Sequence, residues 1–198
     1  MLIEEERIDP REFYFDGEPG WRQNLRRCII RENGKWKVFY TERGEEHDVQ
    51  FFDTEEEAVQ YFYDWAMDDK EYIGEATDEE IEKWKRFQEW WEVAKNRKVR
   101  TVGELKRVLI EEERLHPKDF HFQGEPDYGK IESWHIVFED GKWRVYFYGQ
   151  DGLKYHYREY DREEDACQYL YRWAIEFAEL ADKISDEEFA EWKKREGR

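Results

Sequence analysis

The fold is decided by Ile29-Ile30-Arg31-Glu32-Asn33-Gly34-Lys35-Trp36-Lys37-Val38 and by its near copy Ile136-Val137-Phe138-Glu139-Asp140-Gly141-Lys142-Trp143-Arg144-Val145. Asn-Gly and Asp-Gly supply the positive φ angles of a tight two-residue turn. We therefore predict two β-hairpins, with strands over 26–32 and 35–41 in the first and over 133–139 and 142–148 in the second.

A two-residue turn also predicts which side chains share a face of each hairpin. Trp36, Val38 and Tyr40 would then lie with Ile29, and the second hairpin would group Trp143, Val145 and Phe147 with Trp134, Ile136 and Phe138. The same register puts Arg27 and Arg31 opposite Tyr40 and Trp36. Either these arginines stack on aromatic rings, or the register differs by one residue.

The repetition extends far beyond the hairpins, because residues 1–86 recur as residues 108–194 at an offset of 107 to 108. The matching positions include Leu2 to Arg7 with Leu109 to Arg114, Phe13 with Phe120, Pro19 with Pro126, Ala58 with Ala166 and Trp65 with Trp173. We predict two modules, residues 1–98 and 99–198, packed closely on each other. Trp90 and Trp91 are candidates for that contact, and the alternative is that they complete the first core.

The remaining elements follow from periodicity and end signals. In the second copy we expect a helix that begins with a capping box at Thr101–Glu104 and ends before Pro117, and Met1 of the first copy aligns with Val108 inside that helix. Short strands should follow at 13–15 and 120–122, and fourth strands near 48–52 and 155–160. Helices over 58–65 and 166–173 should begin with acidic first turns. The last helix of each copy should begin with a capping box, at Thr77 in the first copy and at Ser185 in the second, and the last helix of the first copy runs to Asn96. The predicted class is α+β: two tandem copies of a helix, an antiparallel β-meander of three to four strands, and two helices.

Composition limits the partners. Acidic residues number 51 against 33 basic ones, for a net charge of −18, so bare nucleic acid would be repelled and a basic protein is a plausible ligand. High solubility alone would also explain the acidity. Neither a leader peptide nor a membrane-spanning run is apparent, and Cys28 and Cys167 form no spaced motif, so we expect a cytoplasmic protein without a disulfide framework.

Signatures of chemistry are missing from the sequence. The five histidines form no metal-binding motif, and no Gly-rich phosphate loop or nucleophile elbow occurs. We expect no metal, no cofactor and no enzymatic activity. An enzyme with a dispersed carboxylate site remains a rival, although solvation of helix surfaces explains most of the carboxylates.

The two copies diverge most after the third strand. Residues 40–48 of the first copy are rich in carboxylates, whereas residues 147–155 of the second carry more aromatic and glycine residues. The second copy is one residue longer across this region, because the offset between the copies changes there from 107 to 108. Carboxylates beside exposed rings suit capture of a basic cleft, because charge steers the encounter and rings supply contact area. The alternative is neutral drift in a hairpin loop.

Gly34-Lys35-Trp36-Lys37-Val38-Phe39-Tyr40-Thr41-Glu42-Arg43-Gly44, with Phe52-Asp53-Thr54-Glu55-Glu56-Glu57-Ala58 downstream, resembles small immunity proteins of bacterial polymorphic toxin systems. The resemblance covers nearly all of each repeat, although the motif itself is short. It implies a cytosolic, non-enzymatic inhibitor that covers the active site of a cognate toxin. The second copy keeps the hairpin and Ala166-Cys167 but has lost Glu-Arg-Gly, which puts equal function of the copies in doubt.

Our leading hypothesis is neutralisation of a toxin with a basic cleft, and the candidate partner contacts are Glu42, Arg43, Glu45, Glu46, Asp48, Asp151, Tyr155 and Tyr157. Glu42 and Arg43 have an alternative role as an ion pair that pins the hairpin end. An acidic nucleic-acid mimic that inhibits a DNA-binding protein is the rival function. It would require carboxylates spaced like backbone phosphates.

Overall fold

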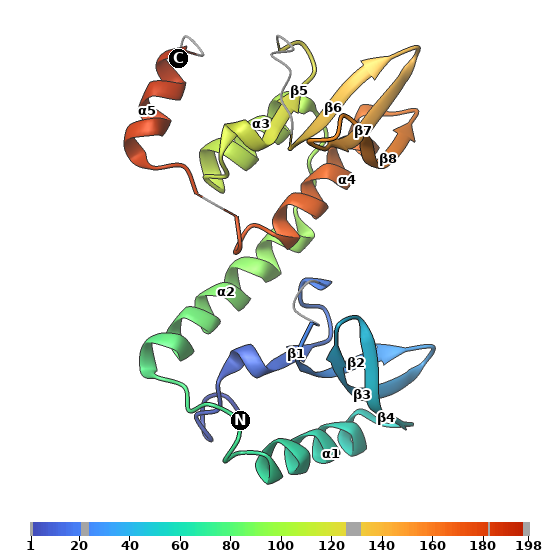
Figure 1. Cartoon of the computed structure of the whole chain (residues 1–198), viewed down its shortest axis with the longest axis vertical. Helices are drawn as coiled ribbons and strands as arrows, with labels where there is room; N and C mark the ends of the chain where they lie inside the picture. The colour runs from blue at the N-terminus through green and yellow to red at the C-terminus, as the bar shows by residue number, and fades with distance from the viewer. Residues whose placement is uncertain (1, 21–23, 126–131, 182, 196–198) are drawn as a thin grey trace. The chain divides into compact units, whose positions relative to one another are not determined.

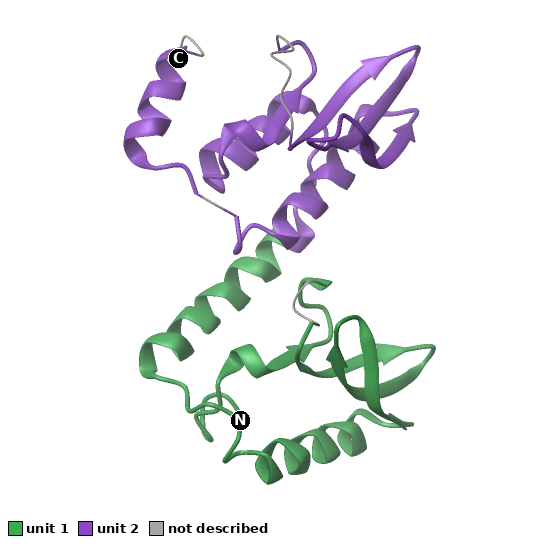
Figure 2. Cartoon of the chain, in the orientation of Figure 1, with its two compact units in different colours: residues 1–94 green, residues 95–198 purple. Residues whose placement is uncertain are grey.

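The computed structural model describes residues 2–20, 24–125, 132–181 and 183–195. It divides the chain into two compact units, Met1–Ala94 and Lys95–Arg198 (Figure 2). The division falls inside a helix, ahead of the boundary predicted after residue 98. Arg97 and Val99 belong with the second unit because both bond the Gln168 side chain. Met1 and Pro126 lie outside the described residues.

The first unit contains, in order, η1 (Pro10–Glu12), β1 (Phe13–Phe15), β2 (Arg27–Glu32), β3 (Lys35–Glu42), β4 (Glu45–Phe52), α1 (Glu55–Asp68) and α2 (Asp78–Asn96) (Figure 1). The second contains α3 (Val102–Lys106), the π-helical η3 (Arg107–Glu112), η4 (Pro117–Asp119), β5 (Phe120–Phe122), β6 (Ser133–Glu139), β7 (Lys142–Tyr148), β8 (Lys154–Tyr160), α4 (Glu163–Glu176) and α5 (Asp186–Arg195). The α+β class is thereby confirmed.

The predicted antiparallel meander of three to four strands is confirmed for the last three strands of each sheet but not for the first. The strand orders are β1-β2-β3-β4 and β5-β6-β7-β8, and β1 pairs with β2, and β5 with β6, in parallel. A parallel pair needs a connection that returns the chain to the strand's starting end. Residues 16–26 and 123–132 separate the paired strands in the sequence, and the last three strands of each sheet form an antiparallel meander.

The hairpin register is the one predicted from a two-residue turn. Ile29 pairs with Val38 and Ile136 with Val145. The turn residues have the required positive φ angles, 51° and 82° at Asn33-Gly34 and 52° and 78° at Asp140-Gly141. The alternative left open for the arginines is settled as well, because Arg27 pairs with Tyr40 in the sheet while its guanidinium carbon lies 5.4 Å from the centre of the Trp65 ring on α1.

One face of each sheet packs on the helix that follows it. On α1, Ala58, Phe62 and Ala66 are buried against Ile29 and Val38. On α4, buried side chains follow the same spacing, at Ala166, Cys167, Leu170, Tyr171, Ala174 and Ile175. Burying one large apolar side chain contributes about 1.5–3 kcal/mol, so this stripe supplies much of the stability of each unit.

Helix ends confirm most of the predicted caps. Thr77 and Glu80, and likewise Ser185 and Glu188, exchange the reciprocal hydrogen bonds of a capping box. The Thr101 hydroxyl accepts from the Glu104 amide, but the Glu104 carboxylate accepts from the amide of Arg100, so that box is only half formed. The helix expected before Pro117 is present as α3 and η3.

Trp91 contacts the first unit. It is 7% exposed, and its Nε1 donates to the Gly17 carbonyl at 2.6 Å. This contact favours the alternative in which Trp91 completes the first core. The close packing of the two modules stays a prediction.

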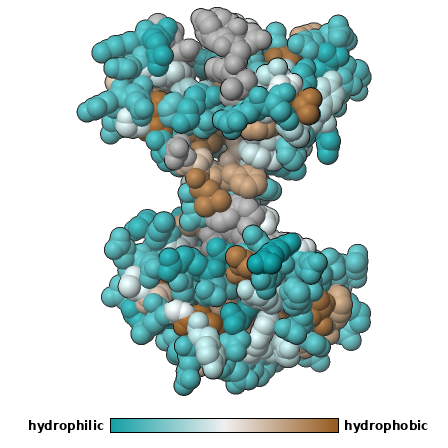
Figure 3. Space-filling view, viewed as in Figure 1, coloured by the Kyte–Doolittle hydropathy of each residue, from teal (hydrophilic) through white to brown (hydrophobic). Residues whose placement is uncertain are grey.

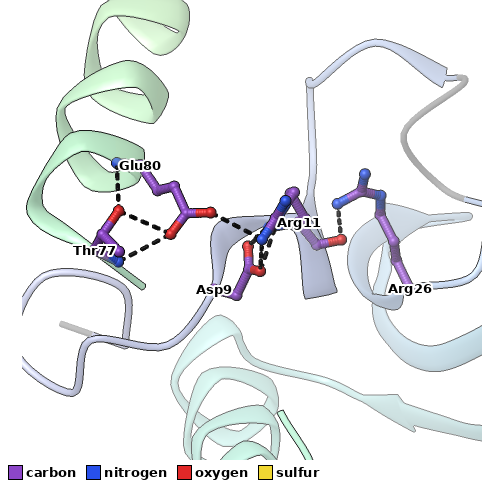
Figure 4. Close-up of polar contacts among 5 residues, drawn as sticks. All are labelled: Asp9, Arg11, Arg26, Thr77 and Glu80. Carbon is purple, nitrogen blue, oxygen red and sulfur yellow. Dashed lines mark hydrogen bonds and ion pairs between the residues drawn. The ribbon is translucent and has the colours of Figure 1, made fainter. Parts of the chain in front are cut away.

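Arg11 links η1 to the start of α2, and a buried carboxylate holds its side chain in place (Figure 4). Asp9 is 7% exposed and accepts hydrogen bonds from the Arg11 amide at 2.8 Å and from its guanidinium. Arg11 also reaches Glu80 at 2.9 Å. Burial would raise the pKa of Asp9, but the hydrogen bonds and charge of Arg11 outweigh it and hold that pKa below its usual value.

We expect Asp9→Asn to lower the free energy of unfolding at pH 7 by about 1–3 kcal/mol, because it removes a charge-assisted hydrogen bond. A depressed folded-state pKa gives stability that is present above the unfolded pKa of about 4 and is lost as pH falls through the folded value. Urea unfolding from pH 7 to pH 3 should therefore show the two proteins converging in acid. Asp16→Asn, at an exposed position, is the matched control. A difference independent of pH would contradict this role.

Candidate functional site

The sheet face turned away from α1 or α4, called the outer face below, carries the main differences between the two units. In the first unit it holds a small cluster of Tyr14, Cys28 and Phe39, with Ile30 and Val49 against it.

Burial raises the pKa of Cys28 and of Cys167 to about 12, so both thiols stay protonated at neutral pH. Neither is suited to act as a nucleophile.

A lysine is held on the outer face of the first unit. The Lys37 side chain is only 5% exposed, and its Nζ lies 2.7 Å from a Glu46 carboxylate oxygen and 3.3 Å from one of Glu32. It also lies 4.7 Å from the centre of the Phe39 ring. Burial works against the charge, but the two carboxylates raise the pKa of Lys37 above its usual value. Glu46 therefore neutralises a nearly buried cation as well as facing solvent.

The predicted contacts of the first unit lie at the end of the β3–β4 hairpin, and all are exposed: Glu42, Arg43, Glu45, Glu46 and Asp48. Glu42 and Glu45 are paired across the turn, while Glu46 pairs with Thr41. Successive residues of a strand point to opposite faces, so the predicted group is split between the two faces. Only Glu46 of the hairpin-end carboxylates reaches Lys37 on the outer face.

The structure gives little support to an ion pair that pins this hairpin end. Glu42 and Arg43 approach to 3.9 Å, with side chains 48% and 90% exposed, and such pairs contribute little in water. Arg43 and Gly44 have φ angles of 52° and 83°, those of a tight hairpin turn. The backbone turn at Arg43-Gly44 thus closes the hairpin without the ion pair, and the Glu42 and Arg43 side chains remain available to a partner.

A β-bulge redirects the fourth strand of each sheet. The register of β3 with β4 shifts between Val38 and Tyr40, and that of β7 with β8 shifts between Val145 and Phe147. Asp48 and His156 occupy corresponding places in these bulges, each with a φ of 53°. A bulge inserts one unpaired residue and interrupts the alternation of side chains between faces.

In the second unit, a different set of carboxylates neutralises the cation on the outer face. Arg144, the counterpart of Lys37, bonds Glu139 at 2.8 Å, Asp140 at 3.0 Å and Glu159 at 3.1 Å. These hydrogen bonds, that of Glu139 first, raise the pKa of Arg144. The counterpart of Glu46 is Lys154, whose Nζ lies 4.1 Å from the centre of the Tyr146 ring. One position therefore carries opposite charges in the two units.

Of the contacts predicted in the second unit, Asp151 and Tyr155 are brought together. The Asp151 carboxylate accepts from the Tyr155 hydroxyl and from the Leu153 amide, the latter at 3.0 Å, and these bonds lower the pKa of Asp151. Tyr157 lies apart, with its ring 6.2 Å from that of Tyr146 on the outer face. Tyr155 and Tyr157 are 44% and 38% exposed, so both present ring surface to a partner.

Two histidines of the outer face were not predicted as a site. The rings of His121 and His135 lie 4.7 Å apart, and His135 stacks at 5.0 Å on Tyr146. Both histidines are 6% exposed, and His121 Nδ1 has no hydrogen-bond partner in the described part of the chain. The same places in the first unit hold Tyr14, Cys28 and Phe39. Comparing the repeats position by position along each strand would have revealed this change.

The visible surface is mostly hydrophilic, with small and separate hydrophobic areas (Figure 3). Within the described ranges, no three His, Cys, Asp or Glu side chains gather at a spacing that could hold a metal ion. None of the described helices combines the length and apolarity that a membrane crossing needs. Comparison of the chain with protein-family models, curated proteins and solved structures gives no match.

Glu46→Ala should lower the free energy of unfolding by about 1–2 kcal/mol, because it leaves a nearly buried ammonium with one carboxylate fewer. The matched change Glu45→Ala removes an exposed carboxylate one residue away and should stay within about 0.5 kcal/mol of the parent. Chemical denaturation of both variants at pH 7 makes the comparison. Equal effects would show that Lys37 does not depend on Glu46.

Proposed function

We propose that this chain is an immunity protein that acts in the cytoplasm, where it binds a cognate toxin and covers a basic active-site cleft with its hairpin ends. The observation that carries the proposal is the contrast between the two hairpin ends. They stand on the same strand order but present different exposed side chains, carboxylates in the first unit and aromatic rings in the second. The resemblance of each repeat to immunity proteins supports the same function.

We infer further that the units arose by tandem duplication of one module. Residues at corresponding sequence positions share unusual positive φ angles, as at Arg7 and Arg114, Leu25 and Glu132, and Asp48 and His156. Non-glycine residues seldom adopt such angles, so their recurrence indicates one backbone design. After a duplication, each hairpin end is free to change while its scaffold is kept.

Charge and ring surface have separate roles in the proposed complex. With a net charge of −18, the chain attracts a basic cleft from a distance and raises the association rate. Glu42, Glu45 and Asp48 extend that field at the first hairpin end. Tyr155 and Tyr157 supply rigid contact area, which is typical of residues that dominate binding energy.

The direct test is co-expression with the toxin domain encoded by the adjacent reading frame. We expect a tight complex and loss of toxin activity. Reversing Glu42, Glu45 and Asp48 to lysine should weaken affinity at least tenfold, mostly through association rate, and leave the thermal transition nearly unchanged. Glu46 is kept, because changing it would also disturb Lys37.

A control variant carries the same change in net charge elsewhere on the first unit, at the exposed residues Asp68, Glu71 and Glu89. It should bind within about threefold of the parent, since distant charges are screened at physiological salt. Equal weakening by both variants would mean that net charge alone acts and that the hairpin end is not the contact. Tight binding of several unrelated DNA-binding proteins would instead favour the nucleic-acid mimic.

A further inference from the structure

The inner side of the first unit contains an apolar groove that is separate from the hairpin ends. Its volume is about 290 Å³, and its walls include Ile3, Phe15, Val59, Phe62, Tyr63 and Trp84. Val59 is 40% exposed although it lies on α1 beside the buried Ala58. The groove thus leaves apolar surface open to water between the helix and the sheet.

In the second unit the same place is filled by α3. Leu105 of α3 is fully buried, and the Nζ of Lys106 lies 5.9 Å from the centre of the Phe122 ring and 5.5 Å from that of Trp192. Phe122 and Trp192 are the counterparts of Phe15 and Trp84, which line the groove of the first unit. Lys106 also bonds Glu125 at 2.7 Å.

Side chains beneath α3 are less exposed than their counterparts in the first unit. Cys167 and Tyr171 are both 0% exposed in the second unit. Their counterparts are Val59, at 40%, and the half-buried Tyr63. The groove of the first unit is therefore a surface that the fold covers when a helix is present, and here no described residue covers it.

The chain leading into α3 is held by two side chains of α4. Gln168 accepts from the Val99 amide at 3.0 Å and donates to the Arg97 carbonyl at 3.1 Å, while Glu163 accepts from the Val102 amide at 2.7 Å. The matching positions on α1 are Gln60 and Glu55, which have the same side chains and are exposed. The first unit thus keeps the groups that would hold an extended segment.

We propose that this groove binds a short basic amphipathic helix of a partner protein, preceded by an extended segment, in the way that the second unit binds its own residues 97–107. Those residues contain five basic side chains and one acidic one, which complements a chain of net charge −18. The partner helix places an apolar residue against Val59 and Phe62 and a lysine or arginine beside Trp84.

The first experiment places the expected occupant in the groove covalently. Because Met1 corresponds to Val108, residues 97–107 are copied directly ahead of Met1 in the full chain. The added segment should raise the melting temperature by several degrees. That rise should vanish when the added segment carries Leu105→Asp, and also when the groove carries Val59→Glu. Val93→Glu, at a 67% exposed position on α2, should leave the rise intact.

The second experiment tests binding in trans. A fluorescent peptide of residues 97–112 should bind the full chain saturably by anisotropy, with at least tenfold loss on Val59→Glu and no change on Val93→Glu or on the hairpin reversal of Glu42, Glu45 and Asp48. An absent temperature rise in the fusion, or peptide binding that survives Val59→Glu, would overturn the proposal. Neither outcome bears on toxin capture by the hairpin ends.

Discussion

The two-residue turns at Asn33-Gly34 and Asp140-Gly141 are the constraint on which each unit depends. They fix the pairing of Ile29 with Val38 and of Ile136 with Val145. A slip of one residue would move every side chain of a strand to the opposite face. Lys37 and Arg144 would then enter the apolar layer beneath α1 and α4, where an ion without a partner is costly. Positive φ angles in four residues thus decide which face becomes core.

With the core assigned in the same way, the two units keep one fold while their outer faces differ. The cation at position 37 or 144 is neutralised in both units, by Glu32 and Glu46 in the first and by three carboxylates in the second. The second unit has Lys154 at the place of Glu46, and Glu159 supplies a carboxylate to Arg144 instead. Buried positions differ as well, with Tyr14 and Cys28 in the first unit where the second has His121 and His135. The units share a scaffold but not a surface.

The inner sides differ for another reason. α3 covers apolar residues of the second unit, whereas no described residue covers the groove beside Val59 in the first. One core is therefore sealed on this side and the other has an accessible flank. This asymmetry agrees with unequal roles for the two units.

By itself, the sequence determined the α+β class, the two hairpins with their turns, and the helix starts at Thr77 and Ser185, because these follow from turn chemistry, capping and periodicity within a few residues. It left two alternatives for the hairpin register, and the strand pairing in the structure decided between them. Only the tertiary structure decided the parallel pairing of β1 with β2, the Lys37–Glu46 pair and the histidine contact. Each of these joins residues on different strands, and local patterns do not report which distant segment a strand or a charge will meet. The groove beside Val59 likewise exists only in three dimensions, since it is bounded by residues from the N-terminal turns, the sheet and both helices of the first unit.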